Sequence, residues 1–224
     1  MIWRLRNRSE AGKLLAERLS TYKKFRDVIV LALPRGGVPV GFEIAQALDA
    51  PLDVFLVRKL GVPGFPQIAL GAIASRGVHY LDHELVAALR VPSAAVEQVV
   101  AREREELERR EEIYRAGRPP LHLEGRTVIL VDDGVATGTS MYVVIAALRR
   151  LKPGRIVVAA PVAPMCTYQE LRICADDVVC LRMPEDFRPL SSFYEDLAQV
   201  SDSEVCRLLE AAERPAPSFP IGVL

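Results

Sequence analysis

The sequence has no surplus of charge of either sign, no long apolar run and no leader-like start. Its 29 lysines and arginines balance its 29 aspartates and glutamates, so net charge provides no general attraction to nucleic acid or anionic lipid. No stretch approaches the roughly 18 consecutive apolar residues that a membrane span needs. The first residues, MIWRLRNRSE, turn polar at once and lack the apolar centre of a signal peptide. We therefore expect a cytoplasmic protein that binds neither nucleic acid nor membranes.

Cysteine is also scarce, and its spacing excludes the common cysteine-based sites. The four cysteines are Cys166, Cys174, Cys180 and Cys206. They form no CxxC pair and have no zinc-finger spacing. Small, buried side chains that stay reduced are therefore favoured over a metal or disulfide role.

Several familiar site motifs are missing. There is no GxxxxGK[ST] phosphate loop, because Gly138 is followed by Thr139 and Ser140 without a lysine, and there is no GxGxxG. No GxSxG occurs, so nothing indicates a nucleophilic serine. His79 and His83 are four residues apart, and Asp82 lies between them. That spacing permits a metal site, but a surface turn is favoured.

Short apolar runs alternate with helical patterns along the chain, half of which is apolar. The expected strands are residues 28–33, 54–57, 128–131, 156–160 and 178–181. The expected helices are residues 9–20, capped by Ser9, and residues 38–48, 93–116, 140–151 and 167–175. Strands that are apolar throughout and alternate with helices predict an α/β fold, an open parallel sheet flanked by helices. We expect a single domain over residues 1–224.

Two segments depart from this alternation. Residues 61–82 begin with a cluster of proline and glycine and continue with two short strand-like pieces, which predicts a mobile hairpin outside the core. The middle of the helix at 93–116, residues 101–106, is almost entirely charged. A solvated face with i,i+4 ion pairs is the favoured interpretation, and a partner-binding helix is the alternative. The tail at 214–217 is expected to be loose.

The segment VILVDDGVATGTS (Val128–Ser140) runs from a strand into a helix. Open α/β sheets bind their ligands at such places. Gly134 and Gly138 allow the backbone to fold tightly and to approach a ligand closely. Amide groups at a helix N-terminus attract phosphate, and two threonines and a serine add hydroxyl donors. The loop is therefore a candidate phosphate site.

An acidic pair, Asp132 and Asp133, precedes this loop. Two carboxylates would repel a phosphate unless they bind something between them and it. A vicinal diol and a magnesium ion both fit, because carboxylates accept hydrogen bonds from hydroxyls and magnesium prefers oxygen ligands. The alternative is an ordinary strand-to-helix turn with an acidic cap, which needs neither two acids nor three hydroxyl side chains.

This segment resembles the signature of type I phosphoribosyltransferases, in which an apolar strand leads to two acids and a small-residue Thr-Gly-Thr loop. The resemblance implies that Asp132 and Asp133 hold the ribose hydroxyls of phosphoribosyl pyrophosphate and support Mg²⁺. It also implies a loop for the 5′-phosphate, formed by Val135, Ala136, Thr137, Gly138, Thr139 and Ser140.

Two further segments fit the same resemblance, which covers residues 27–181 in order and spacing. ALPRGGVPVG resembles the pyrophosphate loop of the family, which implies pyrophosphate binding by Arg35, Gly36 and Gly37 and a cis bond before Arg35. An ordinary trans turn is the alternative for that bond. LVRKLGVPG resembles the basic segment before the flexible part of the family, which implies pyrophosphate binding by Arg58 and Lys59.

The C-terminal stretch, residues 182–213, is similar to that of a bacterial subgroup whose acceptor is generally unassigned, and it implies a small hood over the site. Phe187, Phe193 and Tyr194 are candidates for stacking on a planar acceptor. Packing within the core or hood is the alternative. At position 136 the 6-oxopurine transferases carry an aspartate, whereas this chain has Ala136, which disfavours hypoxanthine and guanine as acceptors.

The expected activity is transfer of ribosyl phosphate from phosphoribosyl pyrophosphate to a nitrogen acceptor, with Mg²⁺ as cofactor and release of pyrophosphate. Arg35 and Lys59 are candidate catalytic residues, because cations offset the negative charge that builds on the leaving pyrophosphate. Asp132 and Asp133 are candidates too, because the resemblance implies that they support Mg²⁺. The alternative is a non-catalytic sensor that kept the sugar-phosphate pocket. A regulator of nucleic acid would need a basic stripe or a DNA-binding domain, and neither is visible. A second copy of the chain is a further candidate partner.

Overall fold

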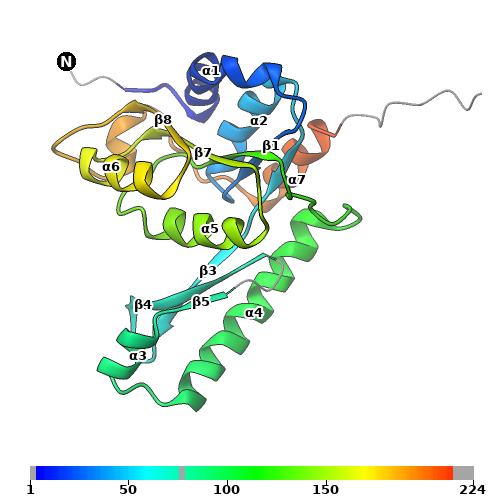
Figure 1. Cartoon of the computed structure of the whole chain (residues 1–224). Coiled ribbons are helices and arrows are strands. Elements are labelled where there is room, and N and C mark those ends of the chain that lie inside the picture. The colour runs from blue at the N-terminus through cyan, green and yellow to red at the C-terminus, as the bar shows by residue number, and fades with distance from the viewer. Residues whose placement is uncertain (1–3, 76–78, 214–224) are drawn as a thin grey trace, which may run out of the picture.

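The computed structural model describes residues 4–75 and 79–213, and its centre is a five-stranded parallel sheet (Figure 1). In spatial order its strands are β2 (Leu52–Val54), β1 (Val28–Ala32), β6 (Thr127–Val131), β7 (Arg155–Val162) and β8 (Asp177–Arg182). All neighbouring strands pair in parallel, with Leu31 beside Leu130 and Val131 beside Ala159. The predicted fold class is confirmed.

The sheet is buried on both faces because its central strands are apolar at every position. Successive side chains of a strand point to opposite faces. Val30 and Ile129 accordingly lie in one apolar cluster, while Leu31 and Leu130 lie in the other. The first cluster is covered by α1 (Arg8–Arg18), α2 (Gly37–Leu48) and α7 (Asp202–Ala211). The second is covered by α5 (Thr139–Arg150) and α6 (Met165–Cys174).

Residues 57–115 form an arm that projects from this core (Figure 1). Its antiparallel sheet has the strand order β3 (Val57–Val62), β4 (Phe65–Ala74), β5 (His79–Leu81). Two helices complete it, α3 (His83–Ala88) and α4 (Ser93–Arg115). The excursion from the core is thus present, and it holds the two expected strands, although β4 is ten residues long and only β5 is short. Its mobility stays a prediction.

The strand expected at 54–57 is wrong in its bounds. β2 ends at Val54, and β3 begins at Val57 in a different sheet. Phe55 and Leu56 join the two strands and are both buried. Arg58 therefore lies inside β3 and not at the end of a core strand.

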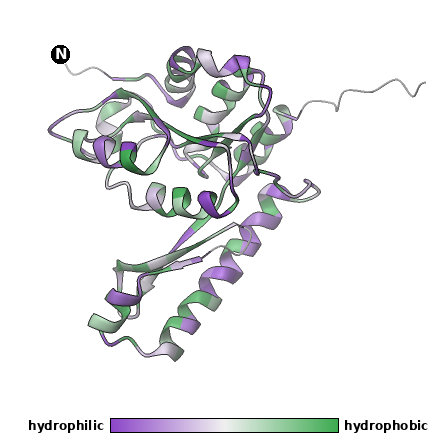
Figure 2. Cartoon of the chain, viewed as in Figure 1, coloured by the Kyte–Doolittle hydropathy of each residue, from purple (hydrophilic) through white to green (hydrophobic). Residues whose placement is uncertain are grey.

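Helix α4 is amphipathic, as its alternating polar and apolar surface shows (Figure 2). Most of its charged middle is exposed, and Glu106 forms the expected i,i+4 pair with Arg110. Its other face buries Val99 and Leu107 in the larger apolar cluster, together with Leu60 of β3. Glu103 is the exception to the predicted solvated middle, because it is buried with this apolar face.

The residue that caps α1 differs from the expected one. Asn7, not Ser9, caps α1 by accepting from the Glu10 amide at 3.0 Å, and Ser9 donates its hydroxyl hydrogen bond to Glu43.

The cysteines are all free, as expected, but they are not buried. Cys166 and Cys174 are exposed on α6, and Cys180 and Cys206 are half-buried. The prediction of small core side chains is therefore wrong in its placement.

The C-terminal segment is tied to the N-terminal one. Leu5 donates a backbone hydrogen bond to Phe193 and accepts one from Glu195, at 2.9 and 2.8 Å. A short 3-10 helix, η3 (Leu190–Phe193), precedes this contact, and α7 follows it. The tail expected to be loose lies outside the described residues. Among the described helices, none is long and apolar enough to cross a membrane.

Candidate functional site

The candidate site lies where two loops meet at the carboxyl edge of the sheet. β1 leads through α2 to β2 on one side, while the neighbouring β6 leads through α5 to β7 on the other. The loops after β1 and β6 therefore diverge, and such a switch point is where open α/β sheets bind ligands. The two loops touch through glycine. A Cβ on Gly36 would lie 2.0 Å from Asp133 Oδ2, and one on Gly37 would lie 2.6 Å from the carbonyl oxygen of Val131.

The acidic pair is held from three directions. The guanidinium Nε of Arg8, the first residue of α1, donates to Asp133 Oδ2 at 2.8 Å. The Tyr194 hydroxyl donates to the Asp133 backbone oxygen at 2.7 Å. The Asp133 amide donates to Asp132 Oδ1 at 2.9 Å. Arg8 is itself fixed by a bond from its Nη1 to the carbonyl of Ala198 at 2.6 Å. These contacts organise the acids before any ligand binds.

The carboxyl group of Asp132 has a raised pKa, first because it is buried and second because the negative charge of Asp133 lies beside it. A cation placed against the pair would relieve both effects. Magnesium commonly binds one or two carboxylates together with substrate phosphates, and this donor set fits that pattern. Among the described residues, no group of three or more acidic, histidine or cysteine side chains forms a complete metal cage. The histidine pair at 79 and 83 is thus not part of one.

The loop after the acids presents a helix N-terminus. Gly138 is the N-cap of α5, has a φ of 73° and provides no side-chain cap, so the first α5 amides have no partner within the helix. Thr137 and Thr139 contact each other through their hydroxyls at 3.2 Å and are exposed. The shape of the loop is fixed by a contact with α6, because buried Thr167 donates to the Ala136 carbonyl at 2.9 Å. Exposed hydroxyls and unpaired amides are suited to a phosphate.

The two ends of the predicted phosphate loop differ. Val135 is buried, and its amide donates to the Val162 carbonyl at 2.9 Å. Ser140 is exposed in the first turn of α5. Residues 136–140 therefore remain the candidates for contact with a phosphate. Val135 instead anchors the loop through its backbone hydrogen bond.

A cavity of about 510 Å³ opens beside this loop. Its walls come from the phosphate loop, from the start of α5, and from β3 and β4 of the arm. The lining residues are Thr137, Thr139, Ser140, Val143, Val57, Lys59, Ala69, Gly71 and Ala72. The structure thus brings Lys59 of β3 to the same cavity as the threonines, as its predicted role requires.

The other two predicted cations engage carboxylates. An Arg35 nitrogen, Nη1, lies 3.8 Å from Asp202 Oδ1 at the start of α7, and the Pro34–Arg35 peptide bond is cis, as the family resemblance implies. Arg58 donates to Glu103 of α4 at 2.7 Å. Arg35 lies in the loop after β1, whereas the guanidinium of Arg58 is directed toward α4. Pyrophosphate binding by Arg58 stays a prediction.

The predicted acceptor residues are packed together. Tyr194 and Phe193 are only 2% and 9% exposed, and the Phe193 ring lies 5.3 Å from that of Phe187. The Tyr194 hydroxyl donates a hydrogen bond to the Asp133 carbonyl, so this side chain contacts the acidic loop. Packing, the alternative interpretation, describes Phe193 and Tyr194 in this structure, and acceptor binding by all three rings stays a prediction.

Residues 6–193 match the family model described as "Phosphoribosyl transferase domain". The chain belongs to this family. In two strains of Mycobacterium tuberculosis, a protein named "Putative phosphoribosyl transferase" is 41% identical over 208 residues, which are 93% of this chain and 47% of the relative. The chain therefore spans about half the length of these curated relatives. The crystal structure of TT1426 from Thermus thermophilus is 43% identical, with a TM-score of 0.80 over 92% of this chain and 97% of that one.

Sequence reasoning missed Arg8 and Thr167, which hold the loop of this phosphoribosyl transferase domain. Arg8 lies 125 positions before Asp133, and Thr167 lies 31 positions after Ala136. Neither residue belongs to a recognisable motif, and only the folded chain brings them to the loop.

Proposed function

We propose that this chain binds phosphoribosyl pyrophosphate with Mg²⁺ and transfers the ribosyl phosphate to a nitrogen acceptor, releasing pyrophosphate. One observation carries the proposal. Gly36 of the loop after β1 lies directly against the Asp133 carboxylate of the loop after β6. A pyrophosphate site, a sugar site and a phosphate site therefore become continuous at one edge of the sheet. The proposal places the protein in nucleotide metabolism.

Each part of the substrate has a matching part of the site. The unpaired α5 amides and the hydroxyls of Thr137 and Thr139 suit the 5′-phosphate. Asp132 and Asp133 suit the ribose hydroxyls as hydrogen-bond acceptors. Arg35 supplies a cation beside the Gly36 and Gly37 backbone, where the pyrophosphate would lie.

In the proposed reaction the acceptor nitrogen forms a bond to the anomeric carbon, and the bond from that carbon to pyrophosphate breaks. Both electrons of the broken bond leave with pyrophosphate, so cations on that side stabilise the transition state. We assign this role to Arg35 and Lys59. Mg²⁺ bound with Asp132 and Asp133 would add a positive charge against the same developing negative charge.

The test of the ribose role is Asp133→Ala, compared with Cys166→Ala on the exposed face of α6. A charge-assisted hydrogen bond contributes about 1.5–3 kcal/mol, so we expect roughly a 10- to 150-fold loss of phosphoribosyl pyrophosphate affinity for the first variant alone. Calorimetry with Mg²⁺ present measures both affinities. Equal affinities in two folded variants would remove the ribose role.

A non-catalytic sensor is the second candidate, supported by the packed state of the predicted acceptor rings, Phe193 and Tyr194. The cations on the pyrophosphate side favour the enzyme. Pyrophosphate release across a panel of bases and amines separates the two. Release with one acceptor establishes a transferase, while binding without release by any acceptor would identify a sensor. The disfavoured acceptors are hypoxanthine and guanine, because Ala136 replaces an acid. A homo-oligomer and a cytoplasmic location stay predictions.

A further inference from the structure

A second cavity, of about 800 Å³, lies between the arm hairpin and α4. It is separate from the phosphate loop, because none of its lining residues comes from positions 132–140. Lys59 lines both cavities and so forms a common wall between them. The volume is within the range of about 300–1,000 Å³ that is typical of small-molecule sites.

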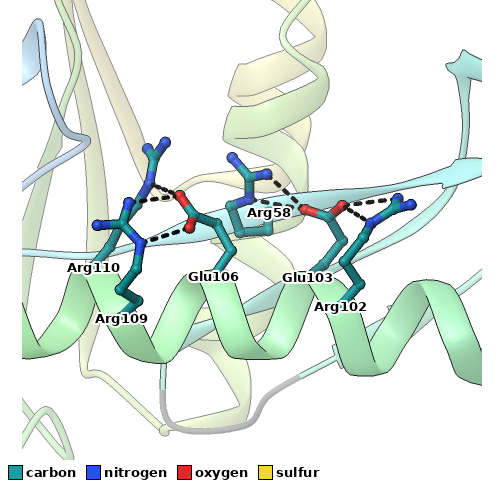
Figure 3. Close-up of polar contacts among 6 residues, drawn as sticks. All are labelled: Arg58, Arg102, Glu103, Glu106, Arg109 and Arg110. Atoms are coloured by element: carbon teal, nitrogen blue, oxygen red, sulfur yellow. Dashed lines mark hydrogen bonds and ion pairs between the residues drawn. The ribbon is translucent and has the colours of Figure 1, made fainter.

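Two arginine side chains line this cavity. Both are paired with Glu103 of α4 (Figure 3). Glu103 Oε2 accepts from Nε and Nη2 of Arg58 at 2.9 and 2.7 Å. Glu103 Oε1 accepts from Nε and Nη2 of Arg102 at 3.2 and 3.1 Å. Both arginines therefore use the same pair of nitrogens for Glu103, and their Nη1 groups are left to donate to a ligand.

The carboxylate lies between the two guanidinium groups (Figure 3). The side chain of Glu103 is 11% exposed, whereas those of Arg58 and Arg102 are 31% and 70% exposed. Each Glu103 oxygen is paired with one guanidinium group, which offsets the negative charge of the carboxylate. With Lys59 as the third cation, the charged residues lining the cavity carry a net charge of +2 (three positive, one negative).

Much of the remaining lining of the cavity is apolar. It includes Val62 and Val99, which are largely buried, and Pro63, Pro66 and Ala95. A ligand that matches both kinds of lining needs an apolar ring and an anionic group close together. Phosphate oxygens are suited to the two arginine groups, because charge-assisted bonds from arginine are among the strongest hydrogen bonds in proteins.

We propose that this cavity is a second ligand site, which binds a nucleoside phosphate with its base on the apolar lining and its phosphates on Arg58 and Arg102. This site is distinct from the proposed substrate site and does not depend on catalysis there, so it assigns Arg58 a role other than the pyrophosphate binding that the family resemblance implies. Glu103 is its positioning residue, because it holds both guanidinium groups toward the ligand.

The test is ADP binding by calorimetry to the whole chain and to Arg102→Gln. Arg102 is well exposed, so its replacement leaves the fold intact, and we expect a roughly 10- to 150-fold loss of ADP affinity. Arg109→Gln is the matched control, since Arg109 pairs with Glu106 on the same helix and does not line the cavity (Figure 3). We expect ADP affinity to be unchanged in that variant.

Amide hydrogen exchange locates the ligand. ADP should protect residues 58–66 and 95–103, and it should still bind when phosphoribosyl pyrophosphate is saturating, because Arg58 and Arg102 do not line the substrate cavity. Failure of ADP to bind at millimolar concentration would overturn the proposal. So would protection of residues 132–140, or complete displacement of ADP by phosphoribosyl pyrophosphate, because either would assign ADP to the substrate site. A protein that does not bind phosphoribosyl pyrophosphate, but binds ADP through Arg102, would contradict only the proposed function.

Discussion

The core and the arm are both sheets covered by helices, but they are stabilised in different ways. In the core, β1 and β6 are buried at every position and are packed from both faces. In the arm, the outer apolar cluster is small, with Val62, Leu70 and Val96 as its buried members. Ion pairs also hold the arm: Arg58 to Glu103 joins β3 to α4 within it, and Arg115 to Asp53 joins its end to the core strand β2.

This difference matters for the site, because the two regions supply different parts of it. The core supplies the loop from Asp132 to Ser140, whose shape is fixed by buried contacts such as that of Thr167. The arm supplies Lys59 to the site, and it also forms the separate second cavity, which depends on how β3 and α4 sit against each other. We infer that the core defines where the sugar phosphate binds, while the arm adds residues that its own polar contacts position.

The largest expected effect comes from one substitution made in both regions. Leu130 of β6 and Leu70 of β4 are each 0% exposed, but Leu130 is surrounded by the core and Leu70 by the small outer cluster. Leucine-to-alanine changes in cores cost about 2–5 kcal/mol, and the cost is lower where neighbours can collapse into the space. We expect Leu130→Ala near the upper end of that range and Leu70→Ala near the lower end.

Urea unfolding at 25 °C measures both losses as changes in the free energy of unfolding. Leu130→Ala should also weaken hydrogen-exchange protection throughout the core, whereas Leu70→Ala should weaken it mainly within residues 57–100. Equal free-energy losses, with the same exchange pattern, would show that core and arm form one cooperative unit and would end the distinction.

The core was predictable from sequence because its signal is local. The run Val128–Val131 is apolar and β-branched, and both the strand and its central place follow from that. The arm was harder, because Phe55 and Leu56 continue the apolar pattern between two different sheets and so merge β2 with β3. The helix α7 was not predicted, since its buried side, Val205, Leu208 and Leu209, is short and lies within a mixed segment.

For the site, sequence motifs identified the two loops but missed the side-chain pairs formed between distant segments. The two glycines after Arg35 and the acids of the next loop follow recognisable patterns, and the fold brings them into contact. The pairing of Arg8 with Asp133, and of Arg58 with Glu103, joins distant segments. No local pattern specifies which arginine meets which carboxylate, so such pairs are visible only in three dimensions.

A smaller effect tests how the core holds its loop. Tyr194→Phe removes the hydroxyl that donates to the Asp133 carbonyl and should cost about 0.5–1.5 kcal/mol of stability. If that bond positions the acid, affinity for phosphoribosyl pyrophosphate falls by about 2- to 12-fold. Tyr22→Phe is the matched control, because buried Tyr22 donates to Asp177. Asp177 begins β8 and so lies at the amino ends of the strands, whereas the Asp133 loop lies at their carboxyl ends.

Calorimetry with Mg²⁺ and urea unfolding give the two readouts for Tyr194→Phe and Tyr22→Phe. Both variants should lose similar stability, and only the first should lose affinity. Equal affinities would mean that Tyr194 stabilises the fold without positioning the loop. A raised KM for the acceptor, with unchanged phosphoribosyl pyrophosphate affinity, would instead support the acceptor role predicted from sequence.

The smallest effect concerns an exposed ion-pair group on the arm. Hydrogen bonds from Arg109 and then Arg110 lower the pKa of Glu106 to about 2, from an ordinary value of 4.5. The stabilisation is therefore complete above pH 4.5 and is lost as the pH falls toward 2, because the unfolded chain takes up the proton first. At pH 6 the urea midpoint of the wild type should be slightly higher than that of Glu106→Gln. This difference in midpoint should be smaller at pH 4 and smaller again at pH 3. Salt at about 1 M should reduce it too, since exposed pairs are screened and contribute little. A difference that is constant with pH would show that these arginines do not stabilise the folded arm through the Glu106 charge.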